Sequence, residues 1–147
     1  MPPIYLDNNA TTPTAPEVLE AMLPFFTEHY HNPSGPYPAG ERAADAVRAA
    51  RTAVARLAGS SAARIVFTTG GSEGISTAFR SALRTTGRPR VLISAVEHSA
   101  VSRNAEAHAD VTLVPVDAEG RLDRAALFDA LDDSVALVSL MLVNNGG

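Results

Sequence analysis

Three short polar segments of this chain follow apolar runs and contain residue types that can bind a small ligand. In residues 68–74, two adjacent glycines and several hydroxyl groups precede an expected helix. Glycine allows close approach of the backbone, and a helix N-terminus offers unpaired N–H groups and a positive dipole end, so this segment suits a phosphate group. It is neither a Walker loop nor a dinucleotide-binding loop. An ordinary, well-capped tight turn explains the same residues.

The other two segments contain an imidazole and a carboxamide. Glu97-His98 follows the run that ends at Val96, where a histidine can stack on a planar ligand or transfer protons; a surface or helix-capping histidine is the plainer reading. Asn144-Asn145 follows the last apolar run, where an amide can bond a ligand's polar edge, although Asn-Asn-Gly-Gly also suits a turn. If the apolar runs are parallel strands, all three segments lie on one rim.

Two residue types are absent, and their absence limits the chemistry of these 147 residues. There is no cysteine, so the chain has no thiolate nucleophile, disulfide or cysteine-based metal site, and we expect no metal. All 12 basic residues are arginine, so no lysine is present. No side chain of this chain can therefore form a Schiff base.

Apolar runs and helical patterns alternate along the chain. Helices are expected at residues 16–30 and 40–57, the second ending near Gly59. Beyond them, apolar runs at 65–67, 91–93, 111–116 and 135–143 are expected to form strands. The helices expected between these runs are at 72–83, 99–108 and 123–131, the last with Asp123 as its cap. Continuous apolar strands separated by helices predict an α/β fold, in which helices flank a mainly parallel sheet on both faces.

The overall composition is that of a folded globular domain. Hydrophobic residues make up 46% of the chain and charged residues 19%, which argues against disorder. The net charge of −4 gives no reason to expect a nucleic acid partner. No apolar run approaches the roughly 20 residues of a membrane span, and the first residues do not form a signal peptide. We expect no membrane association and a cytoplasmic location.

Five motifs, in this order and at these intervals, resemble one known family across essentially the whole chain. They are residues 5–13 (YLDNNATTP), 32–34 (NPS) followed by Gly40, 67–73 (FTTGGSE), 97–101 (EHSAV) and 138–145 (VSLMLVNN). The chain resembles the cysteine desulfurases, in the class V aminotransferase group of fold-type I pyridoxal 5′-phosphate (PLP) enzymes. The resemblance implies that residues 1–147 form part of the PLP-binding large domain, without the C-terminal half.

The resemblance also implies roles for individual residues. Gly71 and Ser72 correspond to positions that hold the PLP phosphate through the backbone and a hydroxyl group. His98 corresponds to the histidine that stacks on the pyridine ring and assists proton transfer. Asn145 corresponds to the asparagine that contacts the phenolic oxygen of the ring and the substrate. Asn9 and Ala10 would lie near the substrate, L-cysteine or a related amino acid.

The chain departs from the family pattern at three places. Where the family usually has Ala-Thr near the phosphate, this chain has Gly71-Ser72, which retains a hydroxyl group. Tyr37 stands where many members have a histidine, which puts any role of that position in doubt. After the paired asparagines, Gly146-Gly147 replaces the usual Glu-Gly. We expect phosphate binding to survive the first difference.

The missing residues imply a partner. The Schiff-base lysine and the sulfur-accepting cysteine of the family would come from a C-terminal half-enzyme chain, and the assembled unit would form a dimer. The reaction would convert L-cysteine to L-alanine and a persulfide. Two alternatives stay open: a catalytically inactive, truncated homologue that serves as a binding or regulatory subunit, and a related PLP lyase or epimerase on the same scaffold.

Overall fold

The structure, a computed structural model, describes residues 4–144, which divide into two compact units. Unit 1 contains the residues up to Ala10 and those from Thr68 onward, and unit 2 contains Thr11–Phe67. None of the helices in the described residues is both long and apolar enough to span a bilayer. Unit 1 thus contains the last two sequence motifs and all of motif 67–73 except Phe67, whereas the Asn-Pro-Ser motif belongs to unit 2.

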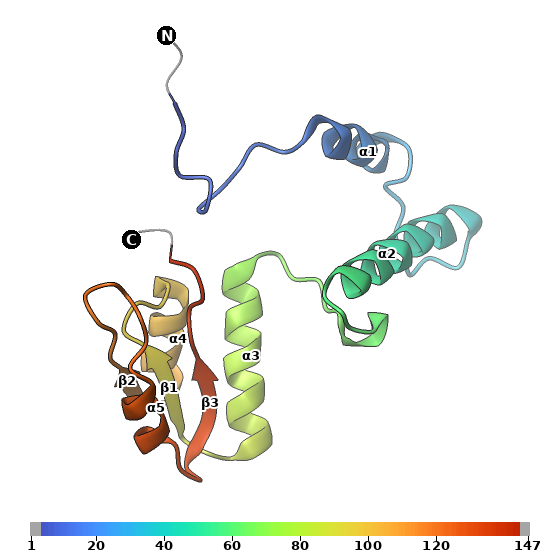
Figure 1. The fold of residues 1–147 in the computed structure, drawn as a ribbon. Coiled ribbons are helices and arrows are strands. Elements are labelled where there is room, and N and C mark those ends of the chain that lie inside the picture. Colours follow the sequence, from blue (N-terminus) through green and yellow to red (C-terminus); the bar gives the residue numbers. More distant parts are fainter. Residues whose placement is uncertain (1–3, 145–147) are drawn as a thin grey trace. The chain divides into compact units, whose positions relative to one another are not determined.

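Unit 1 is built on a parallel sheet of three strands (Figure 1). The strands are β1 (Arg90–Ser94), β2 (Asp110–Val114) and β3 (Val135–Ser139), in the order β2-β1-β3. The central strand β1 is the most buried, with every residue from Val91 to Ser94 buried. A strand with a neighbour on each side and a helix over each face meets no water, which explains this continuous apolar run.

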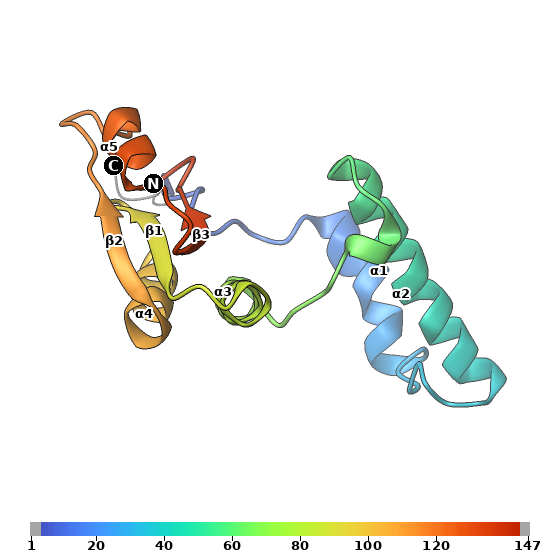
Figure 2. The same cartoon turned by 90° about the horizontal axis from the view of Figure 1, so that it is seen from below.

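Helices cover both faces of the sheet, as Figure 2 shows from below. The helices α3 (Gly71–Thr86) and α4 (Ser99–His108) pack on one face, and α5 (Arg124–Ala130) packs on the other. Successive side chains of β1 point alternately into two hydrophobic cores, one on each face of the sheet. The first core contains Phe79, Val91, Ile93, Val101 and Ala105, and the second contains Leu92, Val114, Leu127 and Val135.

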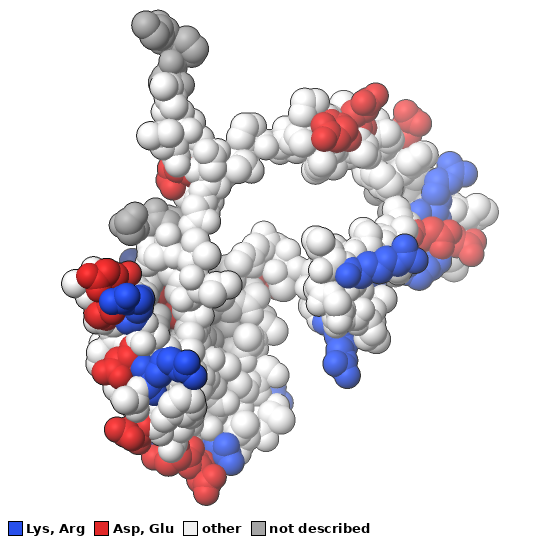
Figure 3. Space-filling model, viewed as in Figure 1, with Lys and Arg blue, Asp and Glu red and all other residues white. Residues whose placement is uncertain are grey.

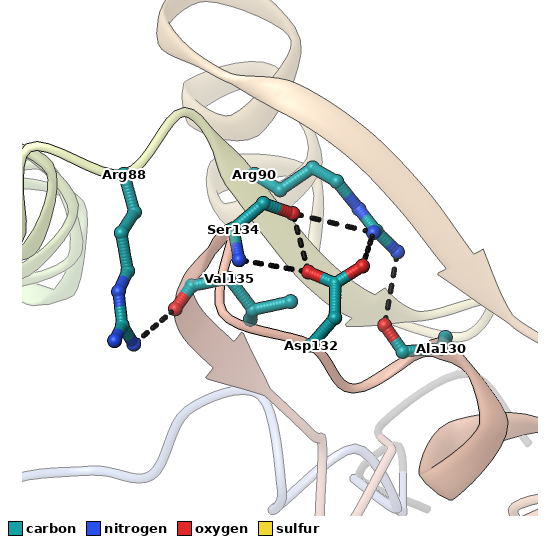
Figure 4. A network of polar contacts seen from close by, with 6 residues as sticks. All are labelled: Arg88, Arg90, Ala130, Asp132, Ser134 and Val135. Carbon is teal, nitrogen blue, oxygen red and sulfur yellow. Dashed lines mark hydrogen bonds and ion pairs between the residues drawn. The ribbon is translucent and has the colours of Figure 1, made fainter.

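A polar network closes the amino end of the sheet (Figure 4). The guanidinium group of Arg90 donates hydrogen bonds to Asp132 Oδ2 at 2.6 Å and to the Ala130 carbonyl at 3.0 Å. Asp132 Oδ1 also accepts hydrogen bonds from the backbone and hydroxyl groups of Ser134. The hydrogen bonds of Ser134, and next the Arg90 charge, hold the pKa of Asp132 below its usual range. This network joins the start of β1 to the turn before β3.

The depressed pKa of Asp132 predicts a loss of stability in acid. A carboxylate with a lower pKa in the folded state stabilises that state above its unfolded pKa of about 4, and the contribution disappears as the pH falls through the folded value. Asp132→Asn should therefore lower the urea midpoint of unfolding at neutral pH. The difference between the midpoints of the variant and the wild type should disappear below about pH 3. The adjacent Asp133 is a matched control, because it is exposed and its carboxylate lies 3.9 Å from the Arg88 guanidinium group. Equal effects of Asp132→Asn and Asp133→Asn would contradict the assignment.

Unit 2 consists of α1 (Pro16–Thr27), α2 (Pro38–Leu57) and a short 3-10 turn, η1 (Ala62–Arg64). Both long helices have proline in their first turn, where the missing N–H is not needed. Gly59 follows α2 with a φ of 61°, which favours glycine and ends the helix. α1 has no buried residue in this chain, and its six large apolar side chains are exposed: Val18, Leu19, Met22, Leu23, Phe25 and Phe26.

The Asn-Pro-Ser motif forms a compact loop against the start of α2. Asn32 Oδ1 accepts a hydrogen bond from the Ser34 N–H at 2.9 Å, and the Gly35 N–H donates to the Asn32 carbonyl at 2.9 Å. A Cβ at the buried Gly40 would lie 2.6 Å from the Gly35 carbonyl oxygen and 2.7 Å from that of Asn32, so only glycine fits. The Tyr37 ring covers Gly35 and therefore has a packing role in this loop.

The structure confirms most of the predicted elements and corrects two of them. The helix predicted at 99–108 is α4, the Asp123 cap accepts a hydrogen bond from the Ala126 N–H at 3.0 Å, and the sheet is parallel with helices on both faces. The strand predicted at residues 65–67 is wrong, because this segment is irregular, with Val66 76% exposed. The last strand ends at Ser139 instead of residue 143.

Candidate functional site

Three polar segments meet the carboxyl end of the sheet in unit 1. Figure 1 shows the first turn of α3 at the same end as the arrowheads of β1 and β3. α3 reaches this position because it runs antiparallel to the strands, and it contacts both α4 and β3. The loops that follow parallel strands meet at one edge of a sheet, where open α/β folds bind their ligands.

The N-terminus of α3 presents free backbone donors. Its cap residue is Gly70, which has no side chain to accept a hydrogen bond from the first turn. Within residues 4–144, no acceptor contacts the N–H groups of Gly71 and Ser72. A Cβ placed on Gly70 or Gly71 would meet no atom within 4 Å, so the space beside the start of α3 is open. The arrangement fits a phosphate group at the positive end of the helix dipole.

Glu73 fixes the loop that leads into α3. Its Oε2 accepts hydrogen bonds from the Thr69 N–H at 2.6 Å and from the Thr69 hydroxyl at 2.7 Å. These two bonds, the backbone one first, lower the pKa of Glu73 below its usual value. The Thr68 hydroxyl donates to the Gly70 carbonyl at 3.0 Å. The carboxylate of Glu73 is therefore engaged behind the loop and leaves the donors of Gly71 and Ser72 unpaired.

His98 is the N-cap of α4. Its Nδ1 accepts a hydrogen bond from the Ala100 N–H at 3.1 Å, so the proton of the neutral ring lies on Nε2. This contact confirms the plainer sequence interpretation, a capping histidine. It uses one edge of an exposed ring and leaves Nε2–H and both faces of the imidazole for other contacts. Capping and ligand stacking are therefore compatible at this position.

The loop before His98 is held by two side chains. The hydroxyl of Ser94, which is only 3% exposed, donates to Glu97 Oε1 at 3.1 Å. Asn144 Nδ2 donates to the Val96 carbonyl at 2.8 Å and links the segment after β3 to the loop after β1. The amide nitrogen of Asn144 thus binds the protein itself. Asn145, the residue predicted to contact a ligand, lies outside the described residues.

A stiff hairpin after β2 completes this end of the sheet. Val116 and Leu122 form an antiparallel bridge, and Asp117 accepts hydrogen bonds from Arg121 Nε at 2.7 Å and from the Arg121 N–H at 2.8 Å. These bonds, the side-chain one first, lower the pKa of Asp117. Acidic and basic side chains accordingly lie side by side on the α5 side of unit 1 in Figure 3. The hairpin lines an open cavity of about 540 Å³ together with Val96, Met141, Leu142 and Asn144.

The structure brings some of the predicted site residues together and leaves others apart. Gly71, Ser72 and His98 belong to the same end of unit 1. Asn9 and Ala10 form an exposed turn whose hydrogen bonds are local, including that from the Ala10 N–H to the Asp7 carbonyl at 3.2 Å. Sequence reasoning missed the supporting bonds of Ser94 and Asn144. Glu73, three residues after the Gly70 cap, stands where a capping box has its Glu, but it bonds Thr69 instead of the cap residue.

Comparison with known proteins agrees with this fold. The family model described as aminotransferase class-V matches residues 4–146. The cysteine desulfurase of Rhodobacter capsulatus is 49% identical over 151 positions, which cover 98% of this chain and 39% of that protein. The cysteine desulfurase of Cereibacter sphaeroides is 50% identical over 149 positions, covering 97% of this chain and 38% of that protein.

A solved structure of a NifS-like protein has the same architecture. It superposes with a TM-score of 0.91 at 32% sequence identity, over 97% of this chain and 41% of that chain. The chain therefore spans about two fifths of the length of the relatives it matches and corresponds to their N-terminal portion. The resemblance noted in the sequence and the α/β fold class are both confirmed. The chain belongs to the aminotransferase class-V family.

Proposed function

We propose that this chain is the N-terminal, PLP-binding part of a cysteine desulfurase-like enzyme, which converts L-cysteine to L-alanine and passes on the sulfur as a persulfide. The observation that carries the proposal is the first turn of α3, where N–H groups without an acceptor in residues 4–144 lie beside open space at the sheet end that also bears His98. Relatives named cysteine desulfurases, at 49% and 50% identity, support the choice of substrate.

In this proposal each site residue has a separate task. The N–H groups of Gly71 and Ser72 and the Ser72 hydroxyl bind the PLP phosphate. His98 covers the pyridine ring and exchanges a proton through Nε2, while its Nδ1 remains on the Ala100 N–H. Asn145 contacts the phenolic oxygen of the ring, and Asn9 and Ala10 face the substrate. Bound PLP supplies an electron sink for the substrate's α-carbon.

Two groups that the reaction needs come from polypeptide outside these 147 residues. The chain contains neither lysine nor cysteine, so it has no amine to anchor PLP and no thiolate to accept sulfur. We assign both groups to a C-terminal half-enzyme chain that completes the large domain, and the completed unit would dimerise. The dimer and the cytoplasmic location stay predictions.

Borohydride trapping tests the proposal. The chain is purified with any polypeptide that accompanies it, incubated with PLP, reduced and mapped by mass spectrometry. We expect the PLP mass on a lysine outside this chain, and L-cysteine with a thiol reductant should yield equal amounts of alanine and sulfide. Omitting the accompanying polypeptide is the control and should abolish both signals.

The other outcomes separate the alternatives. Racemised cysteine, or a different carbon–sulfur cleavage product, would assign the site to an epimerase or another lyase. Binding to an active homologue without retention of PLP would favour a regulatory subunit. Failure of the purified protein to bind PLP under any of these conditions would refute the proposed function.

A further inference from the structure

The peptide unit between Val96 and Glu97 is fixed on both sides. Its carbonyl oxygen accepts a hydrogen bond from Asn144 Nδ2 at 2.8 Å, and its N–H donates to the Ser94 carbonyl at 3.3 Å. The Asn144 bond joins residues 48 positions apart in the sequence. The bond therefore connects two loops that the sheet brings together at its carboxyl end, and it restrains rotation of this one peptide plane.

The same turn is attached to the sheet at other points. The Ala95 N–H donates to the Val114 carbonyl, the last residue of β2, at 3.0 Å. The Ser94 hydroxyl donates to Glu97 Oε1 at 3.1 Å. β2 therefore holds one side of the turn, while Asn144, from the segment after β3, holds the other. Of these contacts, only the Asn144 bond reaches the carbonyl two residues before His98.

We propose that Asn144 is a positioning residue for His98. The restrained Val96–Glu97 peptide lies one residue before the backbone of His98, which enters α4 with φ −62° and ψ 145°. In this conformation Nδ1 lies 3.1 Å from the Ala100 nitrogen and accepts its hydrogen, which keeps the ring proton on Nε2. The functional meaning of this arrangement rests on the proposed function, in which Nε2–H and the ring face serve the cofactor.

The alternative is that Asn144 merely secures the segment after β3. In that case its loss would lower stability and leave the imidazole unchanged. The tautomer of His98 separates the two roles, because a change in global stability does not move the ring proton between Nδ1 and Nε2. Asn104 is a matched control, since its Nδ2 also donates to a backbone carbonyl, that of Ala100, at 2.8 Å.

The experiment is long-range ¹H–¹⁵N NMR of the ¹⁵N-histidine-labelled protein, with its accompanying polypeptide, at about pH 9, where an ordinary imidazole is neutral. His98→Gln identifies the His98 signals. Wild type and Asn104→Ala should show His98 with an unprotonated Nδ1. In Asn144→Ala and in the isosteric Asn144→Asp, loss of one hydrogen bond should shift the ratio of the two tautomers about fivefold toward Nδ1–H.

The readout is independent of PLP binding. Unchanged His98 tautomers in both folded Asn144 variants, as judged by circular dichroism, would overturn the positioning role even if PLP binds. If neither variant folds, Ser94→Ala, which releases Glu97 from the same turn, must shift the tautomer ratio in the same direction, and its failure to do so also overturns the proposal. Absence of PLP binding in wild type, with the tautomer shift present, would refute the proposed function and leave the role of Asn144 in place.

Discussion

Replacing Ser72 with Asp should weaken PLP binding by at least about 100-fold, because the variant loses a hydroxyl donor to a charged group and places a carboxylate beside the phosphate. Ser72 is the second residue of α3, where the N–H groups lack partners in the described part of the chain. The same carboxylate should stabilise the cofactor-free protein, since a negative charge at a helix N-terminus contributes about 0.3–1 kcal/mol. The two effects have opposite signs.

Fluorescence titration with PLP and thermal unfolding without PLP measure these two effects. Ser81→Asp is the matched control, because Ser81 is an exposed serine of the same helix, beyond its first turns. It should alter neither the affinity nor the melting temperature appreciably. Equal PLP affinities for Ser72→Asp and Ser81→Asp would contradict binding of the PLP phosphate at the N-terminus of α3.

Leu92→Ala should cost about 2–5 kcal/mol of unfolding free energy in unit 1. Leu92 is fully buried at the centre of β1 and packs with Val114, Leu127 and Val135 beneath α5. The substitution removes apolar contacts and leaves a cavity in a core that consists of few side chains. Because small domains have a total stability of only about 5–15 kcal/mol, much of the fold's stability depends on this residue.

Urea unfolding followed by circular dichroism measures the loss. Leu113 provides the control, because it lies in the neighbouring strand β2 but is 61% exposed. Leu113→Ala should change the unfolding free energy by no more than about 0.5 kcal/mol. Similar midpoints for the two variants would mean that the sheet does not have the burial pattern described above.

Sequence patterns predicted the helices of unit 1 well, because the signals are local. The spacing of Val101 and Ala105 marks the buried face of α4, and Asp123 caps α5 through a bond to a residue three positions away. The apolar runs that became strands were also visible, since β1 is continuously buried. Each of these features depends on residues within one or two turns of one another.

Strand limits depend on partners and could not be predicted in the same way. The apolar run at residues 65–67 has no neighbouring strand in the structure, and a lone three-residue run gains no ladder hydrogen bonds. β3 ends at Ser139 because its pairing with β1 ends at Ile93–Ser139. The apolar residues after Ser139 instead form the loop that leads to Asn144.

The candidate site was predictable only in its individual residues. Segment 68–74 and His98 were singled out by residue type and by their place after apolar runs, and the structure places both at one end of unit 1. The sequence alone favoured a helix beginning at Ser99 and allowed a capping role for His98, which the contact between its imidazole and the Ala100 N–H confirms. The bond from Asn144 to Val96 depends on tertiary structure, because the two residues are 48 positions apart.

The strand order has a consequence for biosynthesis. β1 lies between two strands that are made after it, and its partner in β3 is about 45 residues further along the chain. At about 5–20 residues per second, a ribosome needs several seconds to add that stretch. Throughout this interval the strand that is most buried in the folded sheet has an unpaired edge, so a chaperone that protects it must act during translation.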